Sequence, residues 1–170
     1  MRFFGTGLLF GAVLVGSIAG VVGALPQVLV PAPAREMLFG LLAVPVLLRE
    51  CGLLRFRVPE NGRLVPEDVQ HLRRWGALQF GFEMGTGMRT FSPSALPHLA
   101  LAAAVLVIPF PAVFVLAAGF AAGRLATALL SNAWSDDGSW TRVWARAEPL
   151  VRPVLALTCT AALVAGMLAA

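Results

Sequence analysis

The sequence predicts an all-α protein that crosses a membrane several times through a bundle of helices. The chain has 170 residues, of which 58% are hydrophobic and 13% are charged, and its mean hydropathy is +0.81. Soluble domains are about half apolar and about one-quarter charged. The charges are clustered, so residues 3–30, 97–123 and 153–170 carry none. Each stretch is close to or above the roughly 20 apolar residues that a membrane-spanning helix needs.

Residues 3–25 are the first predicted span, which ends where Pro26 interrupts the chain. Two pairs of glycines, each four residues apart, lie on it: Gly7, Gly11, Gly16 and Gly20. Glycines at this spacing let a second helix approach closely, which favours helix association in lipid. Glycine is also frequent in membrane helices that make no such contact. The pattern therefore indicates a packing face, with glycine abundance as the alternative.

Residues 36–56 are a second, weaker predicted span, bent at Pro45. Arg49 and Glu50 fall in its final third, where charged side chains reach the membrane interface rather than the bilayer centre. Residues 55–74 form the most extended polar stretch, which we interpret as a compact cytoplasmic loop.

Residues 75–97 are apolar enough to enter a membrane, yet they contain charges, four glycines and a Ser-Pro-Ser sequence. Such a segment can span, re-enter or lie at the surface. An ionisable group inside it is by default a candidate for a functional site. Glu83 and Arg89 are therefore candidate contacts to a substrate or partner, with snorkelling to the interface as the alternative. Gly81 and Gly85 form a further helix-packing pair.

Residues 95–109 and 111–130 predict a helical hairpin that turns at Pro109-Phe110-Pro111. A single helix over both stretches would be about 50 Å long, whereas the hydrocarbon layer is roughly 30 Å thick. A polar loop with three tryptophans follows, and residues 149–170 are the last predicted span.

The second arm of this hairpin carries further candidate residues. Arg124 could contact an anionic headgroup or pair with Glu83, and snorkelling is again the alternative. Gly119 and Gly123 form another pair at the helix-packing spacing.

The arginines predict the topology. If residues 75–91 crossed the membrane there would be six spans, with arginines on both sides. With five spans, nearly all arginines share one side and Arg35 is alone on the other, as the positive-inside rule favours. We therefore predict about five spans, within a range of four to six, in a bacterial plasma membrane. The N-terminus is expected in the cytoplasm, and residues 75–94 are expected to be re-entrant or interfacial.

Neither the cysteines nor any motif predicts catalysis, a metal ion or a cofactor. Cys51 and Cys159 form no CxxC and match no zinc-site spacing, and a disulfide requires the fold to bring them together. Phosphate-loop, nucleophile-elbow and HExxH motifs are absent from the sequence. The arginines that give the net charge of +4 lie beside apolar segments, so nucleic acid is not an expected partner.

Residues 81–98, GFEMGTGMRTFSPSALPH, resemble the glycine-rich, Thr- and Pro-containing broken helix of the cytochrome-c-biogenesis thiol-disulfide transporters. They also resemble the small membrane proteins for methylamine utilisation that are grouped near these transporters. In the transporters, a proline-cysteine step in this helix holds the redox thiol. Thr90-Phe91-Ser92-Pro93 contains no cysteine, so the resemblance implies a relative without the redox pair, or one that uses Cys51 and Cys159.

Three functional hypotheses follow, and membrane lipid surrounds the protein in each. The first is a non-catalytic subunit or accessory component that packs its glycine faces against other membrane subunits or a second copy. The second is a small-solute transporter or channel in which Glu83 or Arg89 contacts the solute. The third is a thiol-disulfide relay through Cys51 and Cys159. Abundant small-residue faces favour the first hypothesis.

Overall fold

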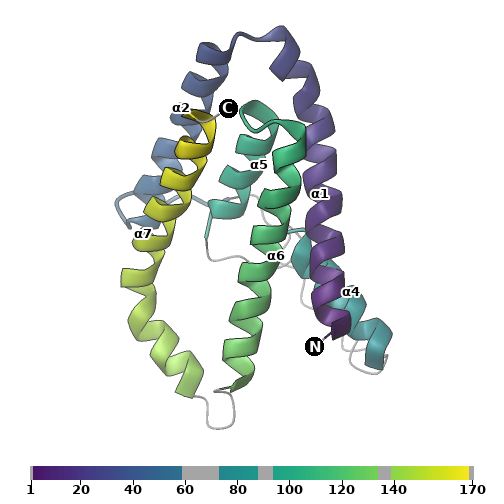
Figure 1. Ribbon diagram of the computed structural model, residues 1–170. Coiled ribbons are helices and arrows are strands. Elements are labelled where there is room, and N and C mark those ends of the chain that lie inside the picture. The colour runs from purple at the N-terminus through teal and green to yellow at the C-terminus, as the bar shows by residue number, and fades with distance from the viewer. Residues whose placement is uncertain (1, 59–72, 88–93, 134–138, 169–170) are drawn as a thin grey trace.

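The computed structural model describes residues 2–58, 73–87, 94–133 and 139–168, and in these ranges the regular structure is entirely helical (Figure 1). This confirms the predicted all-α class. The helices are α1 (Arg2–Leu29), α2 (Ala32–Glu50), α4 (Arg73–Gly85), α5 (Leu96–Leu106), α6 (Phe110–Ala133) and α7 (Ser139–Leu168).

Three of these helices are long and apolar enough to cross a membrane: α1, α6 and residues 142–166 of α7. Their outward faces, and that of α2, carry large apolar side chains, including Phe10, Leu25, Met37, Val115 and Leu150. An exposed apolar surface of this extent is stable in lipid, not in water. The structure is thus that of a helical membrane protein.

α1 and α4 touch backbone to backbone through glycines on both helices. A Cβ atom on Gly7 would overlap the carbonyl oxygen of Leu78, and one on Gly81 would overlap the backbone of α1. The same holds one turn later for Gly11 and Gly85, which lie against each other's helices. Residue numbers rise together along the two helices, so α1 and α4 run parallel.

α1 also packs against α6, which runs in the opposite direction. A Cβ on Gly20 would lie 2.7 Å from the ring of Phe110, and one on Gly5 would lie 3.4 Å from Leu125. Gly16 lies between these two points and also faces α6. The early part of α6 therefore meets the late part of α1.

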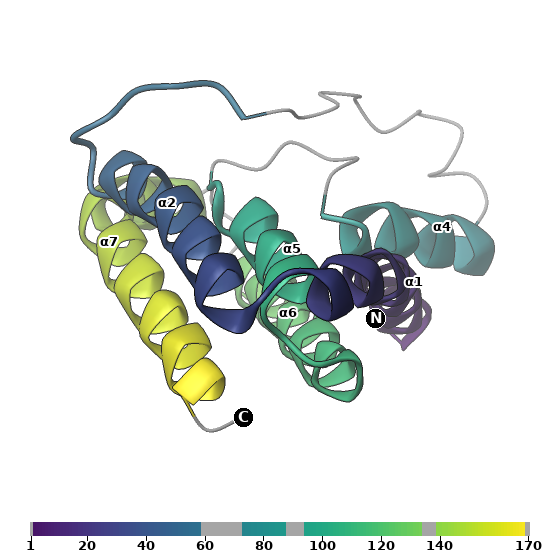
Figure 2. The same ribbon diagram turned by 90° about the horizontal axis from the view of Figure 1, so that it is seen from above.

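α4 and α5 lie against successive parts of α1. α4 packs on its first three turns, whereas Val105 near the end of α5 lies beside Gly23 of α1. α5 also runs parallel to α1. α2 is antiparallel to α5, because Arg35 near the start of α2 bonds the end of α5 and Glu50 bonds its start. α2 is also antiparallel to α7, because Glu50 bonds Arg152, while Phe39 shares an apolar cluster with Leu163 further along α7. Seen from above, α1 and α4 form one side, α2 and α7 the other, and α5 and α6 lie between them (Figure 2).

Several helix ends differ from the predicted ones. α1 continues through Pro26 to Leu29, because proline removes only its own N–H and the helix still closes with a bond from the Val30 N–H to the Pro26 carbonyl at 3.0 Å. α2 ends at Glu50 instead of residue 56, since Gly52 adopts a left-handed φ of 78°. α7 begins ten residues earlier than predicted, at Ser139.

The chain between the predicted hairpin arms turns at residues 107–109, ahead of α6. Most of the predicted 55–74 loop, residues 59–72, lies outside the described residues.

The glycine contact of α1 with α4 is tested by Gly81→Ala. The added methyl group overlaps the carbonyl oxygen of Phe4, so the helices must separate and the free energy of unfolding should fall by about 1–3 kcal/mol. Gly40→Ala on α2 is the matched control, because a Cβ there has no neighbour within 4 Å among the described residues. Thermal unfolding in detergent measures both. Equal stability of the two variants would contradict the close contact.

Candidate functional site

α4 ends before the chain reaches α5, and a glycine follows the end of this helix. The N–H of Gly87 donates to the carbonyl of Met84 at 3.2 Å, and Gly87 has a φ of 69°. A left-handed glycine in this place is a common helix end. A side chain at Gly87 would also lie 3.1 Å from Phe120 of α6, so both conformation and space require glycine.

α5 has only 11 residues, so a large share of its backbone groups are the unpaired groups of helix ends. In a membrane these groups must find partners within the protein. At its C-terminal end, the Gln27 side-chain amide donates to the carbonyl oxygens of Ala104, Val105 and Ile108 at 3.0–3.3 Å. Arg35 of α2 donates to the carbonyl oxygen of Leu106 at 2.7 Å. These two side chains cap the C-terminal end.

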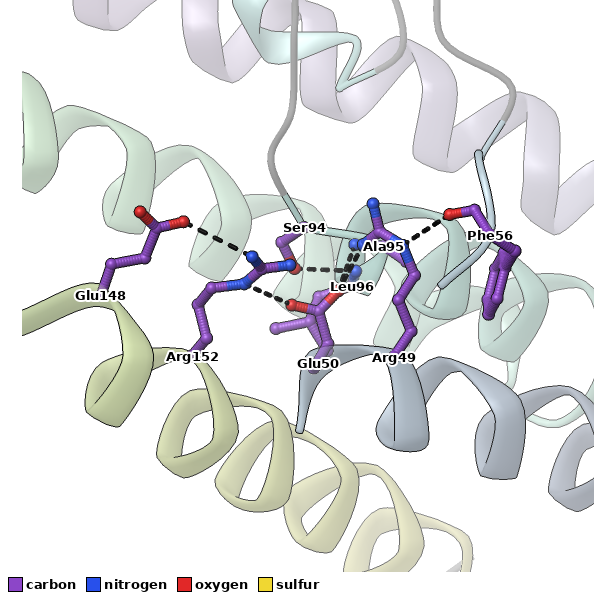
Figure 3. Close-up of polar contacts among 8 residues, drawn as sticks. All are labelled: Arg49, Glu50, Phe56, Ser94, Ala95, Leu96, Glu148 and Arg152. Carbon is purple, nitrogen blue, oxygen red and sulfur yellow. Dashed lines mark hydrogen bonds and ion pairs between the residues drawn. The ribbon is translucent and has the colours of Figure 1, made fainter. Parts of the chain in front are cut away.

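A buried carboxylate caps the opposite end of α5. The side chain of Glu50, the last residue of α2, is fully buried, and its Oε1 accepts a hydrogen bond from the Ala95 N–H at 2.7 Å (Figure 3). The Ser94 hydroxyl accepts a bond from the Leu96 N–H at 3.1 Å. The N-terminus of a helix carries partial positive charge, which favours a carboxylate there. α2 therefore holds α5 at both ends, with Arg35 at the negative end and Glu50 at the positive one.

Two arginines neutralise Glu50. Arg49 Nη1 lies 2.8 Å from Oε1, and Arg152 Nε of α7 lies 3.2 Å from Oε2 (Figure 3). Arg152 Nη1 is also 3.5 Å from Glu148 Oε1. The arginine side chains keep 16% and 29% of their surface exposed. Glu50 thus joins α2, α5 and α7 through charge-assisted bonds to both of its oxygens.

A small cavity of about 50 Å³ lies beside the interruption, between α1, α5 and α6. Apolar side chains and backbone line it, among them Gly85, Gly87, Pro97 and Phe120. A volume of this size holds a few water molecules at most, and they would find few polar partners. The cavity lies next to the end of α4 and the start of α5.

The structure does not bring the predicted charged candidates together. Glu83 is half-buried on α4, and its carbonyl oxygen accepts a hydrogen bond from the Thr86 hydroxyl at 2.7 Å. The guanidinium of Arg124 lies over the ring of Phe120 on its own helix, at 5.4 Å from the ring centroid. Among the described residues, no ion pair joins Glu83 to Arg124. Arg89 lies outside the described residues.

Both cysteines are free thiols, Cys51 exposed and Cys159 half-buried. Cys51 follows Glu50, which faces Arg152, whereas Cys159 lies seven residues further along α7. This register separates the two cysteines by about 10 Å along the helix, and a disulfide needs Cα atoms within about 7 Å. The arrangement does not fit a disulfide between them.

The predicted glycine pairs divide into two groups. Six of the glycines lie against neighbouring helices: Gly7, Gly11, Gly16, Gly20, Gly81 and Gly85. Gly119 and Gly123 of α6 instead face outward, and a Cβ on either would meet nothing within 4 Å among the described residues.

The functional roles of Glu50 and Gln27 were not predicted. The sequence placed Glu50 at the membrane interface and gave no sign that its side chain is buried, because its partners come from α5 and α7. These partners lie 45 and 102 residues away in the sequence, so no local spacing reveals them. A carboxylate and an amide at the ends of apolar segments are the only signal that the sequence offers.

Comparisons with models of known protein families, with curated proteins and with solved structures found no match for this chain.

The buried carboxylate is tested by Glu50→Gln. The amide can still accept the bond from the Ala95 N–H, but it removes the buried negative charge that pairs with Arg49 and Arg152. We expect the free energy of unfolding to fall by about 3 kcal/mol, the lower end for a broken buried pair, since both arginines reach the surface. Glu148→Gln is the matched control and should cost less than about 1 kcal/mol, because Glu148 is 32% exposed. Chemical denaturation in detergent compares the two, and equal losses would contradict the central role of Glu50.

Proposed function

We propose that the protein crosses the membrane five times, with α4 and α5 together forming the third crossing. The helix directions support this proposal, because α1, α4, α5 and α7 run one way and α2 and α6 run the other. α4 and α5 are consecutive and parallel, so neither needs a return through the membrane between them. α2 has 19 residues, which is about 28 Å of helix and close to the hydrocarbon thickness.

The arginines support a cytoplasmic N-terminus in a bacterial plasma membrane. The start of α1, the end of α2 and the start of α7 lie at the same end of the bundle. The exposed arginines at this end are Arg2, Arg55, Arg57, Arg74, Arg142 and Arg146. Arg35 lies at the opposite end, beside the end of α5. Basic residues concentrate on the cytoplasmic side of membrane proteins.

Cys51 offers a test of this orientation. It is exposed at the end of α2, so in a Cys159→Ser background it is the single thiol of the protein. A membrane-impermeant maleimide should label it in inverted membrane vesicles and not in intact cells. Val30→Cys in a background without the two native cysteines is the reciprocal probe, because Val30 follows α1 at the end of the bundle opposite to Cys51. It should be labelled in intact cells. Labelling of Cys51 from outside the cell would contradict the orientation.

We further propose that the protein is a non-catalytic subunit or accessory component of a larger membrane assembly. The outward glycines of α6 carry this proposal. Gly119 and Gly123, with Ala118 and Ala122, form an exposed small-residue face, and such faces let another membrane helix approach closely. The glycine pairs of α1 and α4 lie against other helices of this chain, whereas no described residue lies within 4 Å of a Cβ on Gly119 or Gly123.

A transport role is less well supported. An interrupted helix is the usual sign of a transport site, because the positive N-terminus of its second half can bind an anionic group. Here the carboxylate of Glu50 already occupies the N-terminus of α5. The adjacent cavity of about 50 Å³ is apolar. These features favour a structural role for the interruption over a role in transport.

Co-purification from native membranes at low detergent tests the subunit role. We expect a membrane partner to co-purify in stoichiometric amount with the native protein. The Gly119→Leu/Gly123→Leu variant should lose this partner, because leucine side chains fill the small-residue face. Gly166→Leu on α7 is the matched control, because Gly166 is also exposed with no neighbour within 4 Å among the described residues. Recovery of only a second copy would identify a homo-oligomer. Purification of the native protein as a stable monomer without a partner would overturn the proposal.

A further inference from the structure

An open hollow of about 540 Å³ lies at the end of α2, next to Arg49 and Arg152. Its volume falls within the range of about 300–1,000 Å³ that small-molecule sites occupy. Residues from α2, from the segment that follows it and from α7 line this arginine hollow: Arg49, Gly52, Leu54, Arg55, Phe56, Arg57 and Arg152. Four of the seven lining residues are arginines, so the hollow suits an anion.

Two of the four arginines of the arginine hollow have a carboxylate partner among the described residues. Glu50 pairs with Arg49 and Arg152, and Glu148 pairs with Arg152. Arg55 and Arg57 are exposed and form no ion pair with a described residue. Within the described ranges, Arg55 and Arg57 therefore supply two positive charges that no carboxylate pairs with.

Arg49 is held in place before any ligand arrives. Its Nη1 pairs with Glu50 at 2.8 Å, its Nε donates to the Phe56 carbonyl at 3.0 Å, and its guanidinium lies 5.7 Å from the centroid of the Phe56 ring (Figure 3). Ordering a side chain in advance lowers the entropy cost of binding. The planar guanidinium fork matches the oxygens of a phosphate group.

Apolar side chains surround the arginines of the arginine hollow. Leu53, Leu54 and Phe56 are 73%, 41% and 40% exposed, and they alternate with Arg55 and Arg57. Apolar side chains next to arginines at the end of a membrane helix suit the boundary between acyl chains and headgroups.

We propose that the arginine hollow binds a phosphate group, either the headgroup phosphate of an anionic phospholipid or free phosphate. Arg55 and Arg57 supply the attraction, and Glu50 indirectly fixes the geometry by holding Arg49 and Arg152. This site is independent of the partner surface on α6, since the two involve different helices.

Lipid titration of the purified full-length protein in an uncharged maltoside detergent tests the proposal. The probes are phosphatidylglycerol, diacylglycerol with the same acyl chains but no phosphate, and inorganic phosphate alone. Native mass spectrometry measures the Kd of each. We expect phosphatidylglycerol to bind and diacylglycerol not to bind. Arg55→Gln/Arg57→Gln should weaken phosphatidylglycerol binding by at least about tenfold, the lower value for losing one charge-assisted hydrogen bond.

Arg142→Gln/Arg146→Gln is the matched control, because it removes the same charge from an exposed part of α7 outside the hollow. It should leave the Kd unchanged. If the double variant of the hollow does not fold, Arg55→Gln and Arg57→Gln singly should each weaken binding by about threefold.

If inorganic phosphate binds and Arg55→Gln/Arg57→Gln abolishes this binding, free phosphate is a sufficient ligand. If phosphatidylglycerol binds and inorganic phosphate does not, the ligand is the lipid headgroup. Equal weakening by the control pair would show a general effect of charge and overturn the proposal. Equal binding of phosphatidylglycerol and diacylglycerol would overturn it as well.

Discussion

The arrangement of this bundle depends on the need to satisfy the backbone of a short helix inside a membrane. α5 is too short to cross alone, and its ends expose carbonyl and N–H groups that lipid cannot bond. Gln27 and Arg35 supply partners at one end, and Glu50 supplies one at the other. Because Arg35 and Glu50 lie near opposite ends of α2, the spacing along α2 matches the length of α5. The position of α2 is thereby determined by the helix that it caps.

Burying Glu50 requires its negative charge to be balanced, and this requirement extends the same network to α7. An isolated carboxylate away from water is costly, whereas a carboxylate with two guanidinium groups and a backbone N–H is stable. Arg152, in the middle of α7, pairs with Glu50. α7 is therefore positioned by charge as well as by its Leu163, which shares an apolar cluster with Phe39 of α2. One ionic cluster therefore links three helices that have few other polar groups in common.

The sequence predicted the class of the fold better than the ends of the helices and the contacts between them. Charge-free stretches located α1 and α6, because a spanning helix needs a long apolar run whatever its neighbours are. Pro26 was misleading, since one missing N–H near a helix end is tolerated. Spacing also failed to separate Gly7 and Gly11, which are buried, from Gly119 and Gly123, which are exposed. All four look alike in sequence, and only the position of the other helices decides their role. The same limit applies to Glu50, whose partners are distant along the chain.

The glycine face of α1 has a consequence for the order in which the protein is made. α1 is a long apolar helix that can enter the membrane on its own. α4 carries Arg73, Arg74, Gln79 and Glu83 in 13 residues, so lipid alone is a poor environment for it. Synthesis proceeds from the N-terminus, so α1 is available for insertion before α4 is made. The glycine face of α1 then offers α4 a packing surface inside the membrane, which α4 needs because it is ill suited to insert by itself.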